Sequence, residues 1–131
     1  MISKVILDTA VIESLWAGDA GSRWLERIAS GDPKPAINAA TLADLIGRTP
    51  DRQAEIQLMA LVELAEIVPL DSKIARAAGG IVRALESDDG AAMQSAIVAA
   101  TSIETGFPVA CVDDEFFTAM GCEIARLDPH S

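Results

Sequence analysis

The sequence has few of the residues on which nucleophilic and zinc chemistry depend. It contains two cysteines, one histidine and no tyrosine, and aromatic residues make up only 4% of its 131 residues. Cys111 and Cys122 lack the spacing of a redox or zinc motif, and the histidine, His130, is the second-to-last residue. We therefore expect no disulfide framework, no Cys/His zinc site and no Ser-His-Asp or Cys-His catalysis. Metal chemistry in this chain would have to use carboxylates, which favour Mg²⁺ or Mn²⁺.

The sequence also lacks a long apolar run and an excess of basic residues. Asp8 interrupts the first apolar run, and no stretch approaches the ~20 residues that a membrane helix needs. We expect no signal peptide, no membrane partner and a cytoplasmic location. Asp and Glu number 20 against 10 Lys and Arg, a net charge of −10, so nucleic acid could bind only through a local basic patch.

What is present favours a globular α/β fold. Half of the residues are hydrophobic and the mean hydropathy is +0.30, which excludes intrinsic disorder. The length fits a single domain over residues 1–131. Short β-branched or apolar runs alternate with helical patterns, which predicts helices on both faces of a mainly parallel sheet of about five strands. We expect strands at 2–7, 36–38, 66–70, 108–112 and 123–127.

Capping residues and apolar periodicity predict the helices between these strands. Thr49 is expected to cap one of them, with Pro50 at its first position. Asp71 or Ser72 is expected to cap another, and Gly106 to end the last. The expected helical segments are 10–29 with a break near 18–21, 39–48, 49–65, 74–85 and 91–105.

Two aspartates stand where α/β proteins place their ligand sites. Asp8 directly follows the first expected strand, and Asp113 follows the fourth. Ligands of parallel sheets bind beyond the carboxyl ends of the strands, so these two side chains are candidates for a shared site.

Four segments resemble, in order and spacing, the motifs of the PIN domain family: ILDTAVI at 6–12, TLADL at 41–45, SAIVAAT at 95–101 and VACVDDEF at 109–116. The resemblance spans nearly the whole chain and is nearest in size to VapC-type toxins of toxin–antitoxin pairs. It implies a three-layer α/β/α PIN-like fold and a Mg²⁺- or Mn²⁺-dependent endoribonuclease. It also implies that Asp8, Asp44 and Asp113 hold the metal and are catalytic, with Asp114 as a further candidate ligand and Thr9 and Ser95 in support.

Two positions depart from the family pattern. Asp44 stands where Glu is usual, so its carboxylate reaches ~1.5 Å less far. Ser95 stands where Asp is usual, which removes a negative charge. Asp114, or the pair Asp88 and Asp89, are candidates to compensate. An active ribonuclease and a catalytically degenerate module that binds RNA or a protein without cleavage therefore both stay open.

The same residues also have structural interpretations. Asp8 could cap a helix, Asp44 could lie on a solvated helix face, and Asp113 could begin a short helix. Ser95 could serve only as a small side chain at a crowded helix contact. A phosphate-transfer receiver or nucleotide binder is disfavoured, because no glycine-rich phosphate loop occurs and no lysine follows Lys73.

Partners other than a metal are suggested by arginine pairs and by one apolar segment. The arginines could line a groove for RNA phosphates or pair with Glu26, Glu55 or Glu86, and the sequence leaves the RNA-binding residues unknown. Residues 56–64 carry more apolar side chains than one helix face can bury, which suggests a homodimer interface or a groove for an antitoxin. The family resemblance implies both partners as well. The arginine pairs are Arg23 and Arg27, Arg48 and Arg52, and Arg76 and Arg83.

Overall fold

A parallel sheet runs through the centre of the molecule. The computed structural model describes residues 4–18, 20–86 and 89–127. In this part of the chain, the strands β1 (Lys4–Leu7), β2 (Lys34–Asn38), β3 (Glu66–Val68) and β4 (Val109–Ala110) form one sheet in the order β3-β2-β1-β4. Every pairing is parallel, with Lys4 opposite Lys34 and Ile6 opposite Val109. The expected α/β class and parallel sheet are confirmed.

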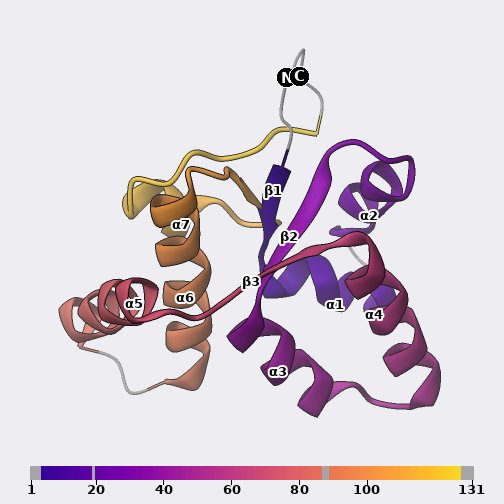
Figure 1. Cartoon of the computed structure of the whole chain (residues 1–131), viewed down its shortest axis with the longest axis horizontal. Coiled ribbons are helices and arrows are strands. Elements are labelled where there is room, and N and C mark those ends of the chain that lie inside the picture. The colour runs from indigo at the N-terminus through magenta and orange to yellow at the C-terminus, as the bar shows by residue number, and fades with distance from the viewer. Residues whose placement is uncertain (1–3, 19, 87–88, 128–131) are drawn as a thin grey trace.

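The helices cover both faces of this sheet. In Figure 1, α1, α2 and α4 lie to one side of the strands and α5, α6 and α7 to the other. No helix of the described ranges is long and apolar enough to cross a membrane. The helices are α1 (Thr9–Ala17), α2 (Ser22–Ala29), α3 (Ala39–Arg48), α4 (Arg52–Leu64), α5 (Ser72–Leu85), α6 (Gly90–Thr105) and α7 (Glu115–Ala119).

Alternate residues of each strand enter opposite cores. Val5 and Leu7 pack in one buried cluster with α1, α2 and α4, whereas Ile6 packs in a second cluster with α5 and α6. The side chains of a strand point alternately to its two faces, so a strand apolar on both faces must be covered on both. The short continuous apolar run of β1 therefore dictates the three-layer architecture that the sequence predicts.

The sequence predicted the capping residue of α5 correctly and that of α4 wrongly. Asp71 caps α5 as expected, because its carboxylate accepts a hydrogen bond from the backbone of Ile74 at 2.9 Å. Thr49 does not cap α4, which was wrong: its hydroxyl donates to the carbonyl of Ile46 at 3.1 Å and closes α3. Asp51 caps α4 instead, accepting from Ala54 at 2.8 Å. Asp51 has extended backbone and its carboxylate can reach the start of α4, whereas the hydroxyl of Thr49 already donates a hydrogen bond to the end of α3.

The expected fifth strand is also wrong. Residues 123–127 pair with β4 only at one bridge, between Val109 and Ile124. The backbone N–H of Val109 donates to Glu123 at 2.9 Å, and that of Ala125 donates to Val109 at 2.8 Å. Because β4 is only two residues long, it offers this segment no further partners, and the sheet has four strands in the described ranges.

Candidate functional site

Asp8 stands at the carboxyl end of β1 with one oxygen unsatisfied. Its backbone N–H donates to Ala110 at 3.0 Å, which ties β1 to the end of β4. Its backbone is extended at the start of α1, but its side chain makes no capping hydrogen bond. The Oδ1 atom is buried and has no hydrogen-bond partner among the described residues. The carboxylate of Asp8 therefore does not serve as the helix cap that the sequence left open.

The surroundings of Asp8 disfavour its negative charge. Burial raises the pKa of Asp8 above its usual value of 3.8, and the charge of Glu13 raises it further. Hydrogen bonding from the backbone and hydroxyl of Thr9 acts in the opposite direction. A buried, unpaired carboxylate is costly unless a cation or donor reaches it. The unpartnered Oδ1 of Asp8 is a hard oxygen donor, the kind of atom that Mg²⁺ or Mn²⁺ prefers.

Asp113 and Asp114 come after β4, the strand next to β1, and lie two and three residues after Cys111. Burial raises the pKa of Cys111 to about 12, and the charges of Asp8, Asp114 and Asp113 raise it too. The thiol of Cys111 is thus protonated, and the negative charges of these three residues disfavour its thiolate. Asp113 is exposed and also accepts a hydrogen bond from the backbone of Glu115 at 3.1 Å, next to the start of α7.

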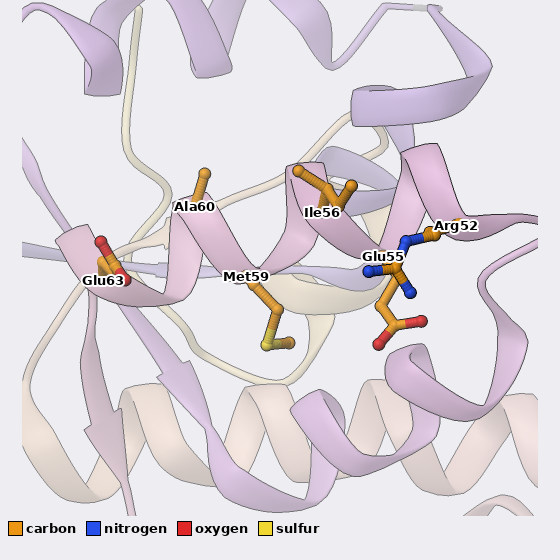
Figure 2. Close-up of a pocket in the computed structure, with 6 residues that line it drawn as sticks. All are labelled: Arg52, Glu55, Ile56, Met59, Ala60 and Glu63. Carbon is orange, nitrogen blue, oxygen red and sulfur yellow. The ribbon is translucent and has the colours of Figure 1, made fainter.

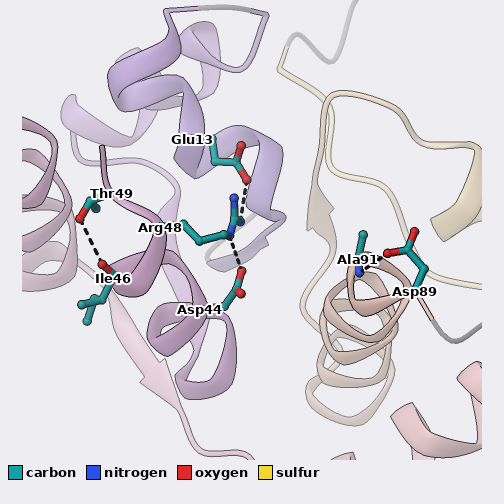
Figure 3. A network of polar contacts seen from close by, with 7 residues as sticks. All are labelled: Glu13, Asp44, Ile46, Arg48, Thr49, Asp89 and Ala91. Atoms are coloured by element: carbon teal, nitrogen blue, oxygen red, sulfur yellow. Dashed lines mark hydrogen bonds and ion pairs between the residues drawn. The ribbon is translucent and has the colours of Figure 1, made fainter. Parts of the chain in front are cut away.

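Asp44 lies on α3 and is held by an arginine one turn later. The Nε atom of Arg48 donates to Asp44 at 2.9 Å, and its Nη2 donates to Glu13 at 2.8 Å (Figure 3). The hydrogen bond to Glu13, followed by that to Asp44, raises the pKa of Arg48. We call these three residues, Glu13, Arg48 and Asp44, the Arg48 clamp. One guanidinium thus forms ion pairs with two carboxylates.

The Arg48 clamp lies on a hollow that also gathers two of the sequence-predicted residues. This hollow, of about 370 Å³, is lined by Thr9 of α1, Asp44 of α3 and Ser95 of α6 together with the rest of the clamp. Gln94 lines it as well, and its Oε1 is buried with no hydrogen-bond partner in the described ranges. Three helices therefore bring their polar side chains to one place, beside the position of Asp8.

The three predicted acids do not form one tight cluster. Asp8 and Asp113 come after two adjacent strands, β1 and β4, whereas the carboxylate of Asp44 is turned to Arg48. Among residues 4–18, 20–86 and 89–127, no group of three or more Asp, Glu, Cys or His side chains is gathered closely enough to hold a metal ion. Asp88 lies outside the described residues, and the side chain of Asp89 caps α6 by accepting from Ala91 at 3.0 Å (Figure 3).

Sequence reasoning missed Glu13 and the role of Arg48. Glu13 follows Thr9 by four residues and Arg48 follows Asp44 by four, a spacing that places each pair on one helix face. That spacing was the available signal. It could not show that α1 and α3 turn these faces toward the same hollow.

The apolar surplus of residues 56–64 is exposed on α4. Ile56 is 58% exposed and Leu64 is 53% exposed, although both are large and apolar. A groove of about 320 Å³ runs along this helix, and Figure 2 shows the side chains that line it. They are Arg52, Glu55, Ile56, Met59, Ala60 and Glu63, none of which lines the hollow at the Arg48 clamp.

Comparison with solved structures finds the same fold over nearly the whole chain. VapC20 of Mycobacterium tuberculosis, a sarcin–ricin loop cleaving toxin, is 19% identical with a TM-score of 0.69, covering 93% of this chain and 98% of that one. A chain of the DNA-bound VapBC structure of Salmonella typhimurium is 20% identical with a TM-score of 0.66, covering 98% and 100%. A chain of a Klebsiella pneumoniae toxin–antitoxin complex is 14% identical with a TM-score of 0.69, covering 92% and 96%.

This chain has the fold of VapC-type toxins. The resemblance read from the sequence motifs is thereby confirmed at the level of the fold. No protein-family model and no curated protein sequence matches the chain. The similarity therefore lies in the arrangement of the strands and helices, which brings the ends of β1 and β4 and the hollow at the Arg48 clamp together.

Proposed function

We propose that this chain is a Mg²⁺- or Mn²⁺-dependent endoribonuclease and the toxin of a VapBC-type toxin–antitoxin pair, acting in the cytoplasm. The observation that carries this proposal is the buried, unpaired oxygen of Asp8 at the end of β1. The likeness to VapC-type toxins supports the same assignment through the fold. A hydrolytic enzyme of this kind needs no nucleophilic side chain, which suits a chain with one histidine.

Asp8 and Asp113 would hold the metal from adjacent strand ends, with Asp44 reaching it from α3 and Asp114 as a further ligand. When bound, the divalent cation supplies a water of lowered pKa and stabilises charge on the phosphate. Thr9 hydrogen-bonds Asp8 and so orients its carboxylate toward the ligand. The hydroxyl of Ser95 lines the same hollow and can orient a water, although it brings no charge.

Cleavage of RNA by the purified chain tests this proposal. Wild type should cleave single-stranded RNA with Mg²⁺ or Mn²⁺ and stop when a chelator is added. Asp8→Ala should lower the cleavage rate at least ~100-fold, because the cation loses its principal ligand. Glu63→Ala, which removes an exposed acid on α4, is the matched control and should leave the rate unchanged. Cleavage that survives either the chelator or Asp8→Ala would refute the proposal.

A catalytically degenerate module is the alternative, and two observations favour it. Position 95 has no acid, and Arg48 already neutralises Asp44. Such a module would bind RNA or a protein without cleaving RNA. Titration with Mn²⁺ in a calorimeter separates the two functions: the ribonuclease takes up Mn²⁺ through Asp8, and the degenerate module does not.

The exposed apolar face of α4 supports the protein partners of this proposal. Its large apolar side chains lie in contact with solvent, an arrangement typical of a surface that another protein covers. The antitoxin and a second copy of the chain are the two partners expected from the sequence. Ile56→Asp should abolish the dimer in light scattering if the copy uses this face. If the antitoxin uses it, the variant should weaken antitoxin binding and leave the dimer unchanged.

A further inference from the structure

A second hollow lies beside the end of β4 and receives two arginines from distant parts of the chain. Its volume is about 320 Å³. Two arginines line it: Arg23 of α2 and Arg126, which lies two residues after Ile124. The lining also includes Trp24, Cys111 and Asp114. Both arginine side chains are exposed. Within the described ranges neither guanidinium takes part in an ion pair. We call this the Arg23–Arg126 hollow.

The backbone around Arg126 is fixed on both sides. The N–H of Ala125 donates to the carbonyl of Val109 at 2.8 Å, and the guanidinium of Arg27 donates to the carbonyl of Leu127. Trp24, next to Arg23, is only 4% exposed and packs in the core under α2. Both arginines thus project from anchored backbone and line the same hollow.

These charges are unusual in a chain with a net charge of −10. Several other cations are neutralised locally: Lys4 pairs with Glu66 at 2.7 Å, Lys73 pairs with Glu104 at 3.4 Å, and Arg48 belongs to its clamp. The Arg23–Arg126 hollow has two guanidiniums against one carboxylate, that of Asp114. It is therefore a local basic patch of the kind an acidic protein needs to bind a polyanion.

The hollow is continuous with the candidate metal ligands. Cys111 and Asp114 line it, and Ala110, which directly precedes Cys111, accepts a hydrogen bond from the backbone N–H of Asp8 at 3.0 Å. A ligand seated on the two arginines would therefore reach the ends of β1 and β4. An acidic peptide suits this place poorly, because Asp113 and Asp114 would repel its carboxylates. A phosphate chain can share a divalent cation with these acids and gives planar, bidentate partners to the guanidiniums.

We propose that Arg23 and Arg126 bind phosphates of single-stranded RNA next to the phosphodiester that lies at Asp8 and Asp113. This inference rests on the proposed function, because it takes RNA as the ligand of the adjacent site. Each phosphate contact on a single strand contributes about 0.7 to the slope of log affinity against log salt. Loss of both arginines should therefore lower the slope by about 1.4 and weaken binding about tenfold at moderate salt.

Fluorescence anisotropy with a labelled, mixed-sequence single-stranded RNA measures both quantities. The full chain keeps Asp8, and a chelator replaces the divalent cation in every titration, which keeps the RNA intact and compares the arginines alone. The double variant Arg23→Gln/Arg126→Gln is compared with Arg76→Gln/Arg83→Gln on α5, which removes the same charge from two other exposed arginines. A polyglutamate peptide of equal charge is titrated in parallel.

Weaker RNA binding and a lower salt slope in the Arg23/Arg126 variant alone support the inference. An equal loss in the α5 variant shows a general charge effect and overturns it, as does failure of the parent protein to bind RNA. Tighter binding of polyglutamate than of RNA through the same arginines would make the hollow a site for an acidic protein and also overturns it. If wild type binds RNA through this hollow but never cleaves it, the proposed catalysis fails while the hollow stands.

Discussion

The two ends of the candidate site differ in whether the chain supplies a positive charge beside their carboxylates. At the end of β1, Asp8 is half-buried, and its Oδ1 atom is buried without a partner among the described residues. At the Arg48 clamp, Asp44 and Glu13 share a guanidinium and stay partly exposed. At Asp8 the negative charge is unfavourable, and a bound cation would relieve it. At the Arg48 clamp, the guanidinium of Arg48 already supplies a positive charge.

The difference follows from where each carboxylate stands in the fold. Asp8 directly follows a central strand whose residues lie in the core, and Thr9 hydrogen-bonds its carboxylate in the part of the chain that the structure describes. Asp44 stands on a helix surface, where a side chain four residues later can reach it. A divalent cation should therefore be recruited mainly by Asp8, with the Arg48 clamp opposing it at Asp44.

The largest expected effect compares the two acids directly. Asp8→Asn should lower the affinity for Mn²⁺ by at least ~100-fold, because it removes an unpaired ligand. Asp44→Asn should lower it only about tenfold, because Arg48 already competes for that carboxylate. Isothermal titration calorimetry measures both affinities, with Glu63→Gln as the control. Equal losses in the two variants would show that the two ends do not differ.

Removing the guanidinium of Arg48 should raise the affinity for Mn²⁺, whereas removing either aspartate lowers it. Arg48→Gln frees Asp44 and Glu13 and should raise the affinity for Mn²⁺ about five- to tenfold, the size expected for two exposed ion pairs. Arg52→Gln, which removes an exposed arginine of α4, should leave the affinity unchanged. A lower affinity in Arg48→Gln would mean that the clamp orients Asp44 toward the metal rather than away from it.

Restoring the missing acid should have a smaller effect. Ser95 lines the hollow at the Arg48 clamp, so Ser95→Asp adds a carboxylate facing the same space as Asp44. We expect an increase in Mn²⁺ affinity of about fivefold, because the new charge is partly satisfied by Arg48. The same calorimetric titration measures it. An unchanged affinity would show that α6 stands too far from the cation for position 95 to contribute.

The smallest expected effect is on the stability of the metal-free protein. The pKa of Asp8 is raised in the folded chain, so its charged form costs stability at pH values above that raised pKa. Asp8→Asn should therefore stabilise the protein at pH 7 by about 1 kcal/mol, a rise in Tm of about 3 to 6 °C.

This gain should shrink as the pH falls through the raised pKa of Asp8 and disappear below 3.8, where folded and unfolded wild type are both protonated. Thermal unfolding in a chelator at pH 7 and pH 4 measures the change. Glu63→Gln, at an exposed position, should show no such dependence. A wild type more stable than Asp8→Asn at pH 7 without metal would contradict the unfavourable burial of this charge.

The sequence predicted the features that follow from local residue patterns. It did not predict the contacts between helices that are far apart in the chain. The break near Gly18 and the positions of Asp8 and Asp113 after their strands were readable from the order of residues. The fifth strand was wrong, since its apolar pattern could not show that β4 would be two residues long. Arg48 was considered with Arg52 and Glu55 along the chain, whereas its partner Glu13 comes from another helix.

A crystal structure with Mn²⁺ tests the central claim most directly, because the anomalous signal of the metal locates it without assumptions about its ligands. The account predicts a peak about 2.1 Å from Oδ1 of Asp8, between the ends of β1 and β4. It also predicts that the guanidinium of Arg48 turns from Asp44 when the peak is present. Full occupancy of Mn²⁺ elsewhere on the chain, with Oδ1 of Asp8 left unliganded, would contradict it.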